Sequence, residues 1–193
     1  AGVRLTPQQR GVGVVFQEHL LFPNLTVLEN VAFGLRARGM ARREARARSR
    51  DWLRRVGLED EAEAKPHALS GGQAQRVALA RALATDPKVI ILDEPVSALD
   101  VSIQAGVINL LEDLQEEFHL SYVFVAHDLS VVRHIADRVA VMYLGQIIEI
   151  GTTTQLFESA THPYTQALIT SIPLPDPRKE RTSERNVVTR DVP

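Results

Sequence analysis

The chain has 193 residues, 45% of them hydrophobic, and a formal net charge of −2. This length is near the size of one domain, and the charge gives no general attraction to nucleic acid or anionic lipid. The sequence contains no cysteine, which excludes disulfides and thiolate metal sites. No apolar stretch approaches the ~20 residues that span a bilayer, and nothing resembles a signal peptide, so we expect the protein to reach a membrane through partners.

The first predicted element is a strand. Residues 12–16 form an apolar run, and the run ends at Gln17. A polar residue in this place, taken alone, indicates only the start of a loop.

The next stretch is predicted to be helical and is rich in arginine. Nine arginines lie between Arg36 and Arg55. A basic run of this kind can form a nucleic-acid-binding face. We favour a solvated helix surface, because Trp52, Leu53 and Val56 supply an apolar side at helical spacing.

A short motif, Leu69-Ser70-Gly71-Gly72-Gln73, precedes a predicted helix that runs to about residue 84. Without a Cβ, Gly71 and Gly72 are expected to approach an anion closely and to adopt the φ values of a tight turn. The amides at the start of the following helix can hold a phosphate. Alternatively, Ser70 acts only as a helix N-cap, and the motif alone leaves both interpretations open.

Four branched apolar residues, 89–92, predict a short strand that is covered on both faces of a parallel sheet. Asp93 and Glu94 follow at its C-terminal end. Phosphoryl transfer needs a carboxylate that holds Mg²⁺ and a group that orients or deprotonates the attacking water. We assign Asp93 to the metal and Glu94 to the water. The alternative is that both acids only cap the following loop.

The segment 97–100 leads into an amphipathic helix that Asp100 can cap. A second buried strand, residues 121–126, ends at His127, and we expect it to deliver this imidazole to the sheet edge that holds Glu94. An imidazole there can hydrogen-bond a terminal phosphate and sense its presence. We interpret the other histidines as structural: His19, His67, His119, His134 and His162.

The remainder is predicted to alternate helices with a hairpin and to end in a tail. The expected elements are a helix over 128–136, strands 139–143 and 147–150 joined around Gly145-Gln146, and helices over 154–158 and 163–172. We expect residues 1–172 to form one domain, and the tail of residues 173–193, rich in proline and charge, to be disordered.

In their order, these motifs resemble those of the nucleotide-binding subunit of an ABC transporter. The resemblance rests on the Q-loop glutamine Gln17, the signature motif 69–73, the Walker B strand 89–94, the D-loop 97–100 and the switch histidine His127. It implies a P-loop NTPase-like α/β fold with a mainly parallel sheet and a helical subdomain inserted at about residues 24–68. It also implies ATP and Mg²⁺ as the bound groups.

The resemblance assigns roles to individual residues. Glu94 and His127 would be catalytic, Gln17 would touch both the Mg²⁺ and the attacking water, and Asp93 would hold the metal. ABC domains of this family act as head-to-tail pairs, so the signature residues would contact ATP held by the opposite subunit. The residues assigned to the nucleotide in this way are Ser70, Gly71, Gly72 and Gln73, together with Asp100 of the D-loop.

The implied partners are integral-membrane permease subunits, a second ABC ATPase subunit and, indirectly, an extracytoplasmic substrate-binding protein, with no nucleic acid. Residues 21–30 are expected to expose apolar side chains that pack against a coupling helix of the permease. The expected location is peripheral, at the cytoplasmic face of the inner or plasma membrane.

One motif of the family, the phosphate-binding Walker A loop Gly-x4-Gly-Lys-Ser/Thr, does not occur in the sequence. The lysines are Lys65, Lys88 and Lys179, and none of them follows a glycine. In the family this loop lies upstream of the Q-loop, so we expect an N-terminally truncated domain that is inactive as given. The alternative is a pseudo-ATPase that evolved without the loop, which the intact Glu94 and His127 disfavour.

Two parts of the chain resemble different subfamilies. Residues 11–85 look like importers of molybdate, sulfate, iron or polyamines, whereas residues 162–168 and 172–177 look like dipeptide and oligopeptide importers. A mixed lineage and two sequences joined near residues 84–100 both stay open. We favour peptides as the cargo, because the C-terminal element is the more distinctive. The alternatives are an inorganic anion, iron or polyamine importer, a nucleic-acid-associated ABC ATPase, and a non-catalytic interaction module.

Overall fold

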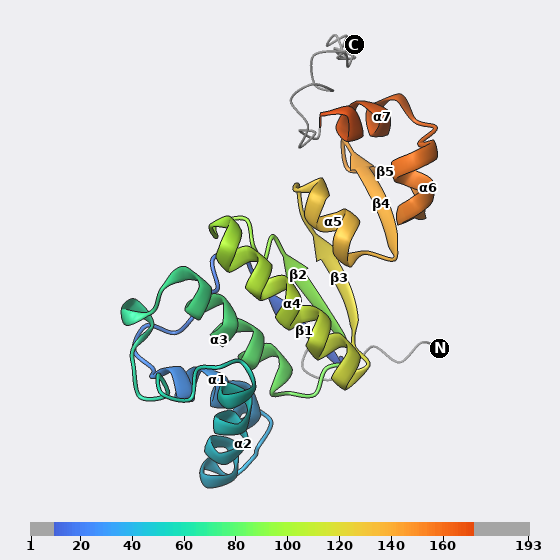
Figure 1. The fold of residues 1–193 in the computed structure, drawn as a ribbon. Helices are drawn as coiled ribbons and strands as arrows, with labels where there is room; N and C mark the ends of the chain where they lie inside the picture. The colour runs from blue at the N-terminus through green and yellow to red at the C-terminus, as the bar shows by residue number, and fades with distance from the viewer. Residues whose placement is uncertain (1–9, 172–193) are drawn as a thin grey trace, which may run out of the picture. The chain divides into compact units, whose positions relative to one another are not determined.

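The computed structural model describes residues 10–171. Its contacts divide the chain into two compact units, residues 1–126 and residues 127–193. Figure 1 shows the elements from β1 to β3 in the first unit and those from α5 to α7 in the second. The expected domain end at residue 172 and the predicted disordered tail lie outside the described residues.

A parallel three-stranded sheet forms the centre of the first unit (Figure 1). Its strands are β1 (Val12–Val15), β2 (Val89–Asp93) and β3 (Ser121–Val125), in the order β1-β2-β3. The apolar runs of the sequence predicted all three strands. Because the strands are parallel, their C-terminal ends lie at one edge of the sheet. The predicted α/β fold class is thereby confirmed.

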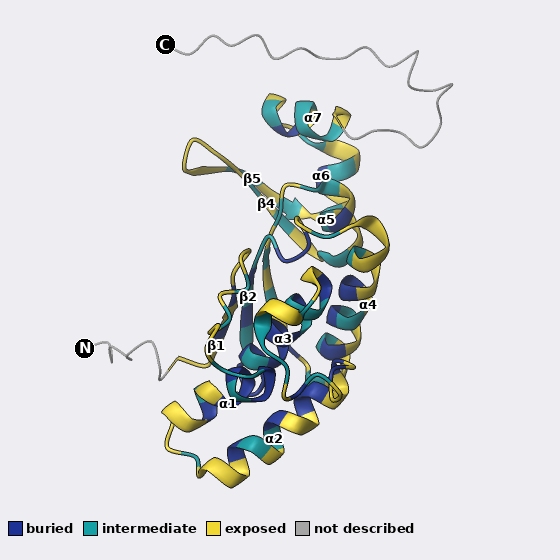
Figure 2. Ribbon diagram, turned by 90° about the vertical axis from the view of Figure 1, so that its left-hand side faces the viewer, coloured by how far each residue is buried: buried dark blue, intermediate teal, exposed yellow. Residues whose placement is uncertain are grey.

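Within residues 10–171, helices cover one face of this sheet. Helices α3 (Gly71–Leu83) and α4 (Val101–Phe118) lie on the same side, where Val15, Ile90 and Leu92 are fully buried (Figure 1, Figure 2). The opposite face exposes valines of β1 and β3 by 37–51%: Val12, Val14, Val123 and Val125. Two predictions are therefore wrong for the described residues, because both helices pack on one side. Strand β2 is not covered on both faces, since Ile91 is only half-buried, and β3 is not a buried strand.

Two helices and a short 3-10 helix lie between β1 and α3, as the predicted helical insertion requires. They are α1 (Val27–Ala37), α2 (Arg42–Arg55) and η2 (Pro66–Ala68). Helix α1 begins at Thr26, whose hydroxyl accepts a hydrogen bond from the Glu29 amide at 3.2 Å.

Residues 21–30 expose less apolar surface than the sequence predicted. Val27 and Leu28 are fully buried in the first turn of α1, whereas Phe22 is 39% exposed. The start of α1 faces into the unit, so a permease could reach only part of this segment.

The arginine-rich stretch is largely neutralised within the chain. Seven of its nine arginines form ion pairs with nearby carboxylates, and one example is Arg54 with Asp51 and Glu59 at 3.1 and 3.0 Å. The seven are Arg36, Arg42, Arg46, Arg48, Arg50, Arg54 and Arg55. This pairing favours the solvated helix surface over a nucleic-acid-binding face.

The described part of the second unit contains a hairpin and three short helices. Its elements are α5 (Leu129–Ile135), β4 (Arg138–Tyr143), β5 (Gln146–Thr152), α6 (Thr153–Ser159) and α7 (Pro163–Thr170). The hairpin turn is Leu144-Gly145, both at positive φ, one residue earlier than predicted. In neither unit does a described helix combine the length and apolar character needed to cross a membrane.

One carboxylate ties β5 to the loop before α7. Glu149 accepts hydrogen bonds from the Thr161 amide at 2.7 Å, the Thr161 hydroxyl at 2.8 Å and the His162 amide at 3.2 Å. The buried hydroxyl of Thr165 also lies near this carboxylate, but outside hydrogen-bond geometry. His162 in turn caps α7, since its Nδ1 accepts from the Tyr164 amide at 3.1 Å, which agrees with a structural role.

Candidate functional site

The predicted Q-loop, Walker B and D-loop residues meet at the C-terminal edge of the sheet. Strands β1 and β2 are neighbours, and Gln17 and Glu94 follow them. The Gln17 Nε2 donates to Glu94 Oε2 at 3.1 Å and to Ser97 Oγ at 3.4 Å. The Ser97 hydroxyl donates to the Glu94 carbonyl at 3.0 Å. Three residues separated by up to 80 positions thus form one polar cluster.

Glu94 has an unusual backbone conformation. Its φ is 44°, in the left-handed region that non-glycine residues enter at a penalty of about 1–2 kcal/mol. The Glu94 amide donates to the Val125 carbonyl at 2.9 Å, which holds this conformation against the end of β3. Strain of this kind is frequent at functional sites, and at Glu94 it coincides with the contact to Gln17.

The donor set at this edge suits a hard cation. Asp93 and Glu94 offer carboxylate oxygens, and Gln17 and Ser97 offer amide and hydroxyl oxygens, which are the ligand types of Mg²⁺. Among residues 10–171, no group of three or more acids or histidines is arranged to hold a metal by itself. A Mg²⁺ ion here would take one or two protein ligands and complete its shell with phosphate oxygens and water, as this ion commonly does.

The signature motif begins α3 with a complete capping box. The Gln73 amide donates to Ser70 Oγ at 3.3 Å, and the Ser70 amide donates to Gln73 Oε1 at 2.9 Å. Ser70 is therefore an N-cap, as one of the two interpretations predicted. The Gln73 side chain also reaches outside the motif, since its Nε2 donates to Glu61 Oε1 at 3.0 Å. The first amides of a helix remain oriented for an anion.

The glycines of this motif serve close packing and not a special turn. Neither Gly71 nor Gly72 has a positive φ, so the predicted tight-turn conformation is wrong. A Cβ on Gly72 would lie 2.4 Å from Ile103 Cγ2, and one on Gly71 would lie 3.4 Å from Leu99 Cδ2. The motif therefore packs against the D-loop and the first turn of α4, which Asp100 caps by accepting from the Ile103 amide at 3.0 Å.

Strand β3 ends at Val125, and His127 lies two residues further on, after Ala126. The His127 side chain is exposed. It is the first residue of the second unit, while Glu94 belongs to the first. Its approach to a terminal phosphate beside Glu94 stays a prediction.

Arg81, in the last turn of α3, is a residue of this region that the sequence analysis missed. Its guanidinium donates to the His19 carbonyl at 2.7 Å and to the Leu20 carbonyl at 2.6 Å. Both carbonyls belong to left-handed residues, with φ of 59° and 43°. Two charge-assisted hydrogen bonds of about 1.5–3 kcal/mol each can offset two backbone penalties of about 1–2 kcal/mol each. The signal in the sequence is one arginine within the apolar run 77–84.

Burial makes this contact unusual for an arginine. Desolvation lowers the pKa of Arg81 below its ordinary value. Among the described residues no carboxylate pairs with it, and its guanidinium lies 5.9 Å from the ring centroid of Phe22. The partners of Arg81 are thus backbone carbonyls and an aromatic face.

Asn30 was also missed, and it fixes the other end of the same segment. Its side chain is fully buried, accepts from the Phe22 amide at 2.7 Å and donates to the Phe22 and Thr26 carbonyls at 3.1 and 3.0 Å. Residues 19–26 are therefore held by Arg81 at one end and by Asn30 at the other.

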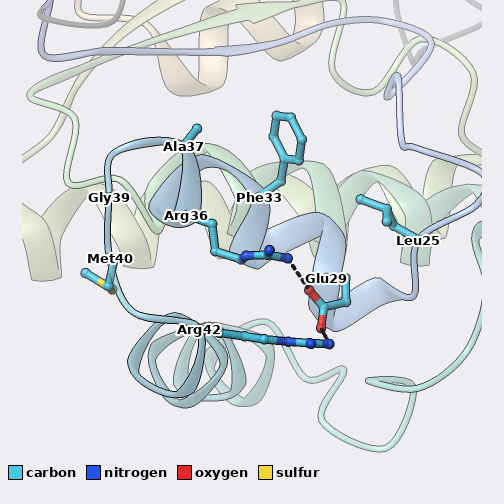
Figure 3. A pocket seen from close by; sticks show the side chains of 8 residues that line it. All are labelled: Leu25, Glu29, Phe33, Arg36, Ala37, Gly39, Met40 and Arg42. Carbon is cyan, nitrogen blue, oxygen red and sulfur yellow. Dashed lines mark hydrogen bonds and ion pairs between the residues drawn. The ribbon is translucent and has the colours of Figure 1, made fainter.

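A pocket of about 570 Å³ opens between α1 and the start of α2 (Figure 3). Apolar side chains and two arginines line it, and Figure 3 shows both arginines pointing toward Glu29. The lining residues are Leu25, Glu29, Phe33, Arg36, Ala37, Gly39, Met40 and Arg42.

The charge of this pocket is on balance positive. Glu29 pairs with Arg36 at 3.4 Å, with Arg42 at 3.6 Å and with Arg46. Burial alone would raise the pKa of Glu29, but the Arg46 hydrogen bond and the three guanidinium charges outweigh it and hold the pKa below its ordinary value. One carboxylate is thus surrounded by three cations.

Comparisons with known proteins show which families the chain resembles. Residues 3–97 match the ABC transporter family, and residues 148–191 match the C-terminal region of oligopeptide/dipeptide transporters. Over most of its length the chain is similar to the ATP-binding proteins of the ABC transporter family.

Two curated relatives match nearly the whole chain. The oligopeptide transport ATP-binding protein OppF of Bacillus subtilis is 47% identical over 187 residues, which are 94% of this chain and 61% of that protein. The dipeptide transport ATP-binding protein DppF of Lactococcus lactis is 46% identical over 185 residues, 93% of this chain and 59% of that protein. The chain thus spans about three fifths of the length of these relatives.

A solved structure shares the fold. It is the ATP-binding cassette MJ0796, in a dimeric post-hydrolysis state bound to ADP and Pi, with a TM-score of 0.66 and 38% identity. The match covers 75% of this chain and 63% of that one.

Proposed function

We propose that the protein is the ATP-hydrolysing subunit of an ABC importer of peptides. The observation that carries the proposal is the contact of Gln17 with Glu94 at the C-terminal edge of a parallel sheet. An acid poised at such an edge, beside an amide and a second acid, suits water activation in phosphoryl transfer.

Each site residue has a task in this proposal. Glu94 accepts the proton of the attacking water, and Gln17 orients that water and, with Asp93, holds Mg²⁺. When bound, the ion neutralises the charge that develops on the phosphates of ATP. His127 hydrogen-bonds the terminal phosphate.

The signature motif acts on a second ABC ATPase subunit. Helix α3 begins at the Ser70–Gln73 capping box, and the first amides of the helix are available for an anion. Ser70, Gly71, Gly72 and Gln73, with Asp100, therefore bind the nucleotide held by the opposite subunit of a head-to-tail pair.

The permease partner docks at the pocket of α1 and α2. Its apolar lining and surplus of arginine suit a short amphipathic segment that carries a carboxylate. The extracytoplasmic substrate-binding protein acts indirectly through the permease, and the ATPase sits peripherally on the cytoplasmic face of the membrane.

Peptides are the proposed cargo. Residues 148–191 match the C-terminal region of oligopeptide/dipeptide transporters. Oligopeptide and dipeptide transport ATP-binding proteins are similar to 94% and 93% of the chain. One set of relatives covers residues on both sides of position 84–100, which supports a single lineage and disfavours two joined sequences.

Uptake by the assembled importer tests the proposal. Vesicles that contain the full-length ATPase and its permeases should accumulate labelled di- and oligopeptides in the presence of ATP, and the Glu94→Gln variant should not. Accumulation of molybdate, sulfate, iron or polyamines without peptide uptake would overturn the cargo. The absence of ATP-dependent uptake of any solute would overturn the function.

A further inference from the structure

The segment after Gln17 is a strained turn whose conformation depends on groups outside it. His19 and Leu20 lie at φ of 59° and 43°, closed by local hydrogen bonds from the His19 amide to the Phe16 carbonyl and from the Leu20 amide to the Glu18 carbonyl. Two consecutive residues other than glycine rarely both adopt a left-handed backbone conformation. The turn therefore needs an external hold, and Arg81 supplies it from α3 through two hydrogen bonds.

We propose that Arg81 is a positioning residue for Gln17: by fixing the left-handed turn at His19 and Leu20, it keeps the Gln17 amide against the Glu94 carboxylate. The proposal rests on the proposed function, in which Glu94 acts on the attacking water. It concerns a residue that touches neither the nucleotide nor the reacting atoms.

The contacts of Gln17 explain why it needs such a hold. Its side chain is exposed and is fixed by two bonds of moderate length, to Glu94 at 3.1 Å and to Ser97 at 3.4 Å. Its backbone lies only two residues from His19. If the turn relaxes to right-handed φ values, the chain direction changes next to Gln17, and the amide leaves the carboxylate.

Arg81 also connects this turn to the pocket of α1 and α2. Its guanidinium lies 5.9 Å from the Phe22 ring centroid, and the Phe22 and Phe33 rings are 4.5 Å apart. Phe33 lines the pocket. A row of direct contacts therefore runs from the pocket through Phe22, Arg81 and the turn to Gln17 and Glu94, so a partner that displaces Phe33 would act on the site through Arg81.

The test compares two arginines of α3 that both donate to backbone carbonyls. Arg81→Gln removes the hold on the turn, whereas Arg76→Gln removes bonds to the Gly72 and Val56 carbonyls, at 3.4 and 3.3 Å. In the full-length importer, Arg81→Gln should lower kcat for ATP hydrolysis by about tenfold, because Gln17 no longer orients the attacking water. Arg76→Gln should leave kcat near the wild-type value.

A glycine rescue separates positioning from general destabilisation. Glycine adopts positive φ without strain, and Leu20 is 51% exposed, so Leu20→Gly should restore much of the kcat lost in Arg81→Gln. Hydrogen exchange of peptides spanning residues 16–22, measured in the same assembly, should rise in Arg81→Gln and fall again in the double variant. A loss of activity without rescue would assign Arg81 to stability alone and overturn the proposal.

Two further outcomes would also overturn it. Unchanged exchange at residues 16–22 in Arg81→Gln would show that the turn does not depend on Arg81, and raised exchange with normal kcat would show that the turn does not position Gln17. If the wild-type importer does not hydrolyse ATP, the proposed function fails and the positioning role with it, while the exchange result still reports on the turn.

Discussion

The Gln17 side-chain amide donates a 3.1 Å hydrogen bond to the Glu94 carboxylate across 77 positions of sequence. The contact exists because β1 and β2 are adjacent and parallel, so residues that follow their C-terminal ends share one edge. Glu94 reaches this contact from a left-handed backbone conformation that the Val125 carbonyl helps to hold.

Glu94→Gln tests the role of this carboxylate in the full-length importer. Glutamine keeps an oxygen that can accept from Gln17, so the shape of the cluster and ATP binding should persist. Turnover should fall by roughly 10²-fold or more, since proton acceptance is lost. ATP binding and phosphate release measured on the same preparation check this. Turnover at the wild-type rate would exclude Glu94 as the base and make His127 the leading candidate.

The close packing at the start of α3 predicts that alanine variants of its two glycines differ in stability. Gly72→Ala places a Cβ 2.4 Å from Ile103 Cγ2 and should destabilise the protein by about 1–3 kcal/mol, more than the roughly 0.5–1 kcal/mol that alanine contributes in a helix. Gly71→Ala, at 3.4 Å from Leu99, should be neutral or stabilising.

Denaturant unfolding of the two variants checks this difference. Ile103→Ala should rescue much of the loss in Gly72→Ala, because it removes the clashing methyl group. Equal stability of the two glycine variants would show that the N-terminus of α3 is not packed against α4 as described.

These glycines illustrate what the sequence could and could not predict. Apolar runs bounded by polar and turn residues predicted β1, β2 and β3, because strand formation and burial leave a local pattern. The resemblance of the motifs predicted that Gln17 and Glu94 belong to one site, and the two side chains are in contact. The clash partner of Gly72 is Ile103, 31 residues away, and no local pattern reports such a contact.

The same limit explains the missed residues. Arg81 bonds to carbonyls 61 and 62 positions away, and its role depends on backbone angles at His19 and Leu20. Asn30 donates hydrogen bonds to the Phe22 and Thr26 carbonyls from its place in the first turn of α1. The uncovered face of the sheet was likewise unpredictable, because an apolar run reports the tendency to be buried but not which elements cover it.

Glu149 predicts an acid-sensitive loop in the second unit. The nearby Thr165 hydroxyl, then the Thr161 amide and hydroxyl and the His162 amide, lower the pKa of Glu149 from 4.5 to about 2. Because the folded state lowers this pKa, the stabilisation is present above pH 4.5 and is lost as the pH falls toward 2. Protection of the Thr161 and His162 amides from hydrogen exchange should decline across that interval.

A matched pair of glutamates controls this experiment. Glu149→Gln should reduce the protection of both amides at neutral pH and remove its decline below pH 4.5. Glu158→Gln, at an exposed position of α6, should change neither. Protection that is independent of pH in the wild-type chain would contradict the role of the Glu149 carboxylate.

The pocket of α1 and α2 predicts how assembly with the permease can be weakened. Arg42 lines this pocket and pairs with Glu29 at 3.6 Å, while its side chain is 71% exposed. An exposed ion pair contributes only about 0–1 kcal/mol, so Arg42→Glu should leave the melting temperature nearly unchanged. It should weaken assembly with the permease by about tenfold, because it places a negative charge where a carboxylate of the partner is expected.

The control variant Arg43→Glu makes the same charge change one residue away, outside the pocket lining, and should assemble normally. Titration of detergent-solubilised permease with each variant provides the measurement, and raised salt should reduce the difference between the two. Equal weakening by both variants would indicate a general charge effect and would remove the pocket as the docking site.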